Sequence, residues 1–193
     1  MRTIGVTMSV TLDGVIQGLG RPDEDTRDGF CHGGWGLRYQ DEVMGKEMSR
    51  GMAKPGVMLF GRRTWQDFLG YWPERPANPV TDHLNEATKY VVSRSLDDVG
   101  AWENSVLLRG EANDTVAALK AEPGPDISIV GSGALVRALH AAGLIDGWTL
   151  LIHPVVLGSG RRLFARNGPL AELTLVRSVA TSAGVIIAHY ERN

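Results

Sequence analysis

The apolar positions of this chain change their period along its length, which predicts alternating strands and helices. Residues 2–12 alternate apolar and polar side chains and are rich in β-branched types, as in a strand. Short apolar runs predict further strands at residues 57–60, 89–92, 105–108, 127–130 and 148–153. Helical spacing of apolar residues, or a capping residue before them, predicts helices at residues 39–53, from 61 onward, at 81–87, 113–120 and around 135–139. The expected caps are Thr81 or Asp82 for the helix at 81–87, and Asn113 with Asp114 for the helix at 113–120.

This order of elements predicts the fold class. Strands that alternate with helices form a largely parallel sheet with helices on both faces. Two alternating stretches near the end, residues 172–179 and 184–190, predict an antiparallel pair. The sequence therefore predicts an α/β fold whose central, mostly parallel sheet has an antiparallel C-terminal edge. At 193 residues, we expect a single domain over residues 1–193.

Composition narrows the class of protein. A net charge of -2 with no run of basic residues argues against a nucleic-acid partner. The single cysteine, Cys31, excludes an internal disulfide and a Cys-x-x-Cys zinc site. The N-terminus leads directly into strand-like sequence, and no apolar run approaches the ~20 residues that span a bilayer. We therefore expect a cytoplasmic protein without membrane partners.

The long segment at residues 17–36 changes composition to glycine, aspartate and arginine, as in a functional or mobile loop. Its acidic residues, 23–25 and 28, lack histidine partners and the spacing of a calcium loop. We therefore expect no metal site there, and interpret the segment as a solvated loop that closes over a ligand.

Three turns follow predicted strands: residues 61–64, 93–94 and 130–135. The carboxyl ends of parallel strands are where open α/β sheets bind ligands. Glycine allows close approach of a ligand, a helix N-terminus favours an anion, and arginine donates paired hydrogen bonds to phosphate. The pattern therefore indicates a phosphorylated dinucleotide. The alternative for each turn alone is a tight turn without a ligand, with its arginines solvated.

Five short segments of the sequence are informative when taken together and in their order along the chain. They are residues 9–16 (SVTLDGVI), 59–65 (LFGRRTW), 91–94 (VVSR), 130–135 (VGSGAL) and 154–160 (PVVLGSG). Together they resemble the dihydrofolate reductase-like superfamily, in particular the RibD C-terminal type of reductase domain of bacterial riboflavin biosynthesis enzymes. The resemblance covers most of the chain. It implies a three-layer αβα arrangement, NADPH as the cofactor, and a homodimer formed through the late strands.

The resemblance also implies the role of each turn. Gly61, Arg62, Arg63 and Thr64 would hold the adenosine phosphates, and Ser93 with Arg94 would clamp the 2′-phosphate of NADPH. Val130 and the segment Gly131, Ser132, Gly133, Ala134 and Leu135 would cradle the pyrophosphate and the nicotinamide side. Ser9, Val15 and Ile16 would border the nicotinamide ring.

The sequence also offers candidate residues for catalysis and for contact with the substrate. By resemblance to folate reductases, Asp41 is the candidate catalytic acid, since burial beside Trp35 would raise its pKa. The spacing from Trp35 differs from that family, and the usual preceding proline is absent. The alternative is that Asp41 and Glu42 only favour a helix N-terminus. Trp35, His153 and Arg161 are candidate substrate-binding residues, with a packed strand-end histidine and a solvated arginine as the alternatives.

The function implied by the resemblance is NADPH-dependent reduction of a small heterocyclic or sugar-linked substrate. The type reaction is that of 5-amino-6-(5-phosphoribosylamino)uracil reductase. A dihydrofolate reductase is one alternative, and the altered context of Asp41 speaks against it. The other alternative is an NADPH-binding protein without catalysis, which would bind NADPH tightly but would not oxidise it, whichever substrate is added.

Overall fold

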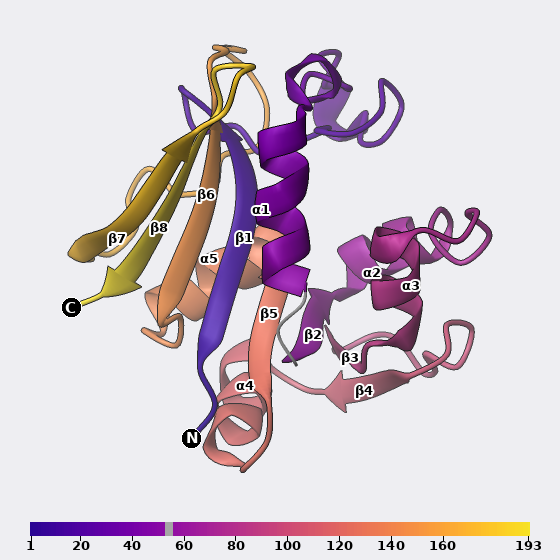
Figure 1. Cartoon of the computed structure of the whole chain (residues 1–193). Coiled ribbons are helices and arrows are strands. Elements are labelled where there is room, and N and C mark those ends of the chain that lie inside the picture. The colour runs from indigo at the N-terminus through magenta and orange to yellow at the C-terminus, as the bar shows by residue number, and fades with distance from the viewer. Residues whose placement is uncertain (53–55) are drawn as a thin grey trace. The chain divides into compact units, whose positions relative to one another are not determined.

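The structure is a computed structural model that describes residues 1–52 and 56–193. The chain forms two compact units, each built from two separate stretches of sequence (Figure 1). The first unit comprises residues 1–5 and 48–146, and the second comprises residues 6–47 and 147–193. That residues 1–193 act as one domain stays a prediction.

The first unit contains four parallel strands in the order β4-β3-β2-β5. Their bounds are β2 (Gly56–Gly61), β3 (Lys89–Ser93), β4 (Ser105–Arg109) and β5 (Asp126–Val130). The predicted strands are confirmed to within one residue at either end. Because the strands are parallel, their carboxyl ends lie at one edge, and the turns after β2, β3 and β5 follow that edge.

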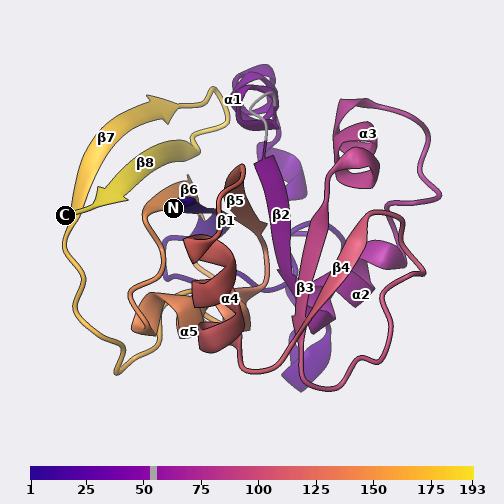
Figure 2. The same ribbon diagram turned by 90° about the horizontal axis from the view of Figure 1, so that it is seen from below.

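Four helices cover these strands: α2 (Arg62–Leu69), α3 (Pro79–Glu86), α4 (Ala112–Ala121) and α5 (Gly133–Ala141). Figure 2 shows α2 and α3 on one side of β2, β3 and β4, and α4 and α5 on the other. The predicted α/β class is confirmed, because helices cover both faces of parallel strands.

Two predicted helix caps are wrong. Asn78, rather than Thr81 or Asp82, caps α3, because its side-chain oxygen accepts the N–H groups of Val80 and Thr81 at 3.0 and 3.1 Å. Pro79 then occupies the first helical position, where a missing N–H is harmless. The N-cap of α4 is Glu111 rather than Asn113 or Asp114, so this helix begins one residue before the predicted cap.

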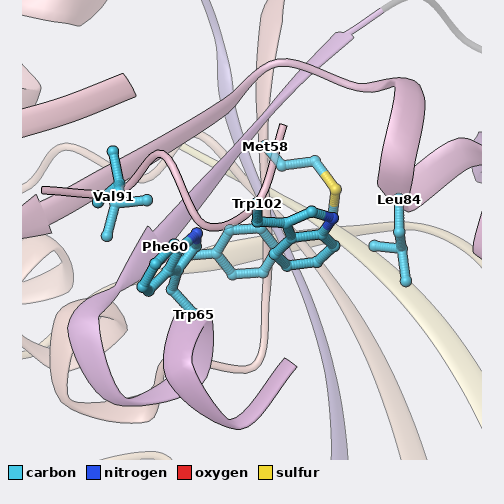
Figure 3. Close-up of a cluster of buried hydrophobic side chains, with 7 residues drawn as sticks. Met58, Phe60, Trp65, Leu84, Val91 and Trp102 are labelled. Carbon is cyan, nitrogen blue, oxygen red and sulfur yellow. The ribbon is translucent and has the colours of Figure 1, made fainter. Parts of the chain in front are cut away.

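A cluster of large apolar side chains lies between β2, β3 and the helices α2 and α3 (Figure 3). Met58 and Phe60 alternate along β2 and therefore point to the same face. Phe60 stacks on Trp102 with ring centroids 6.3 Å apart. The cluster fixes α2 against β2, and thereby fixes the turn that joins them. Its buried members are Met58, Phe60, Trp65, Leu84, Val91, Val99 and Trp102.

A buried lysine closes the edge of this cluster. Lys89 is 0% exposed, and its ammonium lies 4.7 Å from the ring centre of Trp102. Its Nζ donates to the carbonyl oxygens of Leu84, Asn85 and Ala87 at 2.8–3.1 Å, which satisfies the C-terminal end of α3. Burial lowers the pKa of Lys89 to about 8, so the ammonium still predominates at neutral pH.

The second unit contains the strands β1 (Ile4–Thr11), β6 (Gly147–His153), β7 (Leu173–Ala180) and β8 (Ile186–Arg192), and β1 begins in the first unit. Strand β8 pairs antiparallel with both β6 and β7, and a bulge interrupts β7 between Leu175 and Arg177. Figures 1 and 2 both show β6, β8 and β7 in this order. The predicted antiparallel C-terminal edge is confirmed.

Helix α1 (Glu42–Met52) begins in the second unit and carries a half-buried stripe of apolar side chains. The predicted helix over residues 39–53 is confirmed except at its ends, since residues 37–39 form a short 3-10 turn and Ala53 lies outside the described residues. Over the described ranges, no helix is both long and apolar enough to cross a membrane.

We predict that Lys89→Met lowers the free energy of unfolding by about 3 kcal/mol, because the buried carbonyl oxygen of Leu84 and the partly buried ones of Asn85 and Ala87 lose this donor. Chemical denaturation at neutral pH measures this change. Lys46→Met is the matched control, since the side chain of Lys46 is 70% exposed. An equal effect of the two substitutions would contradict the role given to Lys89.

Candidate functional site

The turns after β2 and β5 lie level with one another in the first unit. In the pairing of β2 with β5, Met58 lies opposite Ser128. Gly61 and Gly131 each come three residues later, so the two turns begin at the same height along the strands. The pairing of β2 with β3 aligns Gly61 with Val92, directly before the 93–94 turn. The expectation that the three turns share one edge is therefore confirmed.

Two hydrogen bonds join the 61–64 turn to the 130–135 turn. The Gly61 N–H donates to Ser132 Oγ at 3.0 Å, and the Ser132 N–H donates to Thr64 Oγ1 at 3.0 Å. Ser132 adopts a left-handed conformation with φ 58°, and Gly131 before it has φ 69°. A Cβ on Gly131 would lie 3.1 Å from Thr64 Cγ2, so glycine permits the close approach of the two turns.

Both helices that follow these turns leave their first N–H groups without a side-chain cap. The Ser132 hydroxyl faces Gly61 and does not cap α5, and the first intrahelical bond runs from the Val136 N–H to the Ser132 carbonyl at 2.9 Å. The N-cap of α2 is Gly61, which has no side chain. Such N–H groups, together with the helix dipole, favour an anion.

The side chains around these helix starts complement an anion. Arg62 and Arg63 are exposed at the first two positions of α2, and Ala134 is exposed on the first turn of α5. Leu135 is 6% exposed, so its side chain is buried and does not face a ligand. Val130 is half-buried and packs against the apolar cluster that contains Phe60 and Trp102.

The 93–94 turn gives its two residues different roles. Ser93 is 6% exposed, and its Oγ accepts the N–H groups of Ser95 and Leu96 at 3.1 and 3.0 Å. Its hydroxyl therefore shapes the turn, which does not support the predicted clamp on a phosphate. Arg94 is exposed and pairs with Glu111, Nη1 to Oε1, at 3.0 Å. The charge that this turn presents is that of Arg94.

In the second unit, Val15 lies in a buried cluster rather than on a ligand-facing surface. It is 0% exposed and packs with Phe30 and Trp35. Its N–H donates to Thr11 Oγ1 at 2.9 Å, and the Ile16 N–H donates to the Arg161 carbonyl at 2.9 Å. Ile16 and Ser9 are half-buried, so they remain the accessible members of the predicted nicotinamide border.

His153 is enclosed by aromatic side chains. It is 1% exposed, and its ring lies edge-on to Trp35 and Tyr39 with centroids 5.0 and 5.5 Å away. Burial lowers the pKa of His153, although hydrogen bonds to the backbone of Leu151 and Val10 oppose this. The Trp35 indole donates to the Gln17 carbonyl at 2.7 Å. Both residues therefore pack the interior, where the sequence predicted substrate contact.

The carboxylate of Asp41 has a structural role, because it accepts hydrogen bonds from two separate segments. Its Oδ1 accepts the Met44 N–H at 2.8 Å at the start of α1, and its Oδ2 accepts the Ser182 hydroxyl and the Ala183 N–H at 2.7 and 2.9 Å. These bonds, led by that from Met44, hold the pKa of Asp41 well below its ordinary value. The expected raised pKa of a catalytic acid is wrong, and the helix N-terminus alternative describes this residue.

Arg161 is engaged by two carboxylates of the long loop. Its guanidinium pairs with Asp28 at 3.0 Å and with Asp25, whose side chain is only 13% exposed. Burial acts to raise the pKa of Asp25, but hydrogen bonds from Arg27 and Arg161 lower it overall. The expectation of a fully solvated loop is therefore wrong at Asp25. A phosphate at Arg161 would meet these two carboxylates.

A cavity of about 260 Å³ lies beside this ion-pair network. Gln17, which is 4% exposed, ties its wall together: its Oε1 accepts the Arg161 N–H at 3.0 Å, and its Nε2 donates to the Arg27 carbonyl at 3.0 Å. The sequence carries no signal for Gln17, because a glutamine at the start of a loop has no motif. The lining residues are Gln17, Asp28, Gly29, Phe30, Ser159, Gly160 and Arg161.

Comparison with known proteins identifies the family. The family model of the RibD C-terminal domain matches residues 2–187. The chain belongs to this family. The YyaP protein of Bacillus subtilis (strain 168), described as uncharacterized, is 29% identical over 198 residues, which cover 100% of this chain and 96% of YyaP.

Solved structures show the same fold. A protein of Shewanella sp. PV-4 named for riboflavin biosynthesis has a TM-score of 0.68 at 20% identity, covering 99% of both chains. A pyrimidine reductase-like protein of Corynebacterium diphtheriae has a TM-score of 0.67 at 12% identity, covering 100% of this chain and 92% of the other. The predicted dihydrofolate reductase-like fold class is confirmed.

We predict that Asp41→Asn destabilises the protein at neutral pH by weakening the bonds to Met44 and the 182–183 turn. The folded pKa lies below the unfolded value of about 3.9, so the charge of Asp41 stabilises the fold above that pH. This contribution is lost as the pH falls through the folded pKa. Denaturation of both proteins at neutral pH and at about pH 3 measures it.

The difference in unfolding free energy between wild type and Asp41→Asn is expected to shrink on acidification. A difference that grows at low pH, or none at neutral pH, would contradict the structural role of Asp41. Glu42→Gln serves as the control, because the neighbouring Glu42 is exposed.

Proposed function

We propose that this chain is an NADPH-dependent reductase of the riboflavin-biosynthesis type. It would reduce a small heterocyclic or sugar-linked substrate, of the class of 5-amino-6-(5-phosphoribosylamino)uracil. Membership of the RibD C-terminal family supports a reductase. The first unit carries the residues that would bind the cofactor and its phosphates.

The observation that carries the proposal is the pair of hydrogen-bonded turns at residues 61–64 and 130–135. They set the starts of two helices next to each other at one edge of parallel strands, and neither start has a side-chain cap. A dinucleotide has two linked phosphates, so adjacent helix starts suit it better than a single anion.

The residues of this edge fit the groups of NADPH. The backbone N–H groups of Gly133 and Ala134 would hold the pyrophosphate, and Arg62 and Arg63 would add charge-assisted hydrogen bonds. Arg94 would hold the 2′-phosphate, because it is the exposed cation of the next turn. When bound, NADPH supplies the hydride that a reductase transfers.

One observation favours a second candidate, an NADPH-binding protein that does not catalyse. The two titratable side chains predicted near the substrate are engaged elsewhere: Asp41 at a helix start and His153 inside an aromatic cluster. A reductase therefore needs its proton from another source, such as water or the substrate itself. A turnover assay separates the two candidates.

We predict that the wild type binds NADPH more tightly than NADH, and that Arg94→Ala removes the preference. Loss of a charge-assisted hydrogen bond to phosphate costs about 1.5–3 kcal/mol, so NADPH binding weakens about 10- to 100-fold while NADH binding changes little. Calorimetric titration of both nucleotides measures this. Arg166→Ala, a change at an exposed arginine of the other unit, is the matched control.

Binding of neither nucleotide would overturn the proposed function. Tight NADPH binding without oxidation in the presence of 5-amino-6-(5-phosphoribosylamino)uracil or related pyrimidines would favour the non-catalytic candidate. NADPH oxidation with dihydrofolate alone, blocked by an antifolate, would instead indicate a folate reductase.

A further inference from the structure

A carboxylate faces the arginine that the proposed function assigns to the 2′-phosphate. Arg94 follows β3, and Glu111 stands at the N-cap of α4, just after β4. The two strands are paired, with Ser93 opposite Arg109, and the Gly110 N–H donates to the Ser93 carbonyl at 3.4 Å. This pairing sets Arg94 Nη1 3.0 Å from Glu111 Oε1.

We propose that Glu111 is a specificity-determining residue that limits the preference for NADPH over NADH; this inference rests on the proposed function. A 2′-phosphate that binds Arg94 must take the place of the Glu111 carboxylate or stand beside it. Like charges at that distance repel one another. A 2′-hydroxyl is neutral and can donate a hydrogen bond to a carboxylate, as an acidic residue does for NAD in other α/β folds. Glu111 therefore weakens NADPH binding and assists NADH binding.

Neighbouring contacts show that the side chain of Glu111 is free to take this role. The Glu111 side chain does not cap α4. Its backbone carbonyl instead accepts the Thr115 N–H at 3.0 Å and the Thr115 hydroxyl at 2.9 Å. These bonds do not involve the carboxylate, so removing its charge leaves the helix start intact.

The turn that carries Arg94 is also held without Glu111. The Ser93 hydroxyl accepts two N–H groups within the turn, and Asp97 pairs with Arg109 at 3.5 Å. The side chains of Arg94 and Glu111 are 74% and 64% exposed, so water competes with their ion pair. The pair can therefore open for a ligand at small cost.

The test is titration of wild type, Glu111→Gln and Glu111→Ala with NADPH and with NADH at low ionic strength. Both variants are expected to tighten NADPH binding about 2- to 5-fold, the range of an exposed ion pair, and to leave NADH binding unchanged or weaker. The ratio of the two Kd values thus moves toward NADPH. The shift is expected to shrink in high salt.

Asp97→Asn is the matched control, because it removes the same charge from the same edge but faces Arg109. It is expected to change the ratio by less than half as much as Glu111→Gln. If wild type binds NADPH but the Glu111 variants leave the ratio unchanged, or change both affinities equally, this inference alone is overturned. If wild type binds neither nucleotide, the proposed function is overturned and the inference with it.

Discussion

The candidate cofactor site at the carboxyl ends of the parallel strands depends on two hydrogen bonds of Ser132, one through its hydroxyl and one through its N–H. The hydroxyl accepts from Gly61 and the N–H donates to Thr64, so one residue fastens the end of β2 to the end of β5. The cost is a left-handed conformation at a residue with a side chain, which is unusual outside turns of this kind. Because the hydroxyl is used across the turns, it is not available to cap α5. The start of α5 therefore has no side-chain cap.

The second unit is built on the opposite principle, since its polar side chains satisfy one another. Asp41 holds a helix start and the turn between β7 and β8. Arg161 binds the long loop through Gln17, Asp25 and Asp28. Burial among aromatic rings lowers the pKa of His153. Three groups of this unit with shifted pKa values, Asp41, Asp25 and His153, therefore have structural partners. Perturbed pKa values arise in structural networks as well as in catalysis.

Local pattern was sufficient to predict the strands and helices, and the edge on which the three turns lie. The period of apolar residues places Met58 and Phe60 on one face of β2, and parallel pairing then carries the turns to a common edge. The roles of single polar residues were not predictable in this way. Asp41 and His153 depend on partners more than a hundred residues away or on burial, and Glu111 meets Arg94 only because β3 and β4 pair. A spacing rule contains none of this information.

A titration of the isotope-labelled protein with NADPH, followed through its backbone amide resonances, tests whether the cofactor binds at these two helix starts. We expect the largest shifts at Gly133 and Ala134 on α5 and at Arg62 and Arg63 on α2, since their N–H groups lie at the two uncapped helix starts. Shifts at saturation that leave these four amides unchanged would contradict this expectation, because NADPH would then bind elsewhere on the chain.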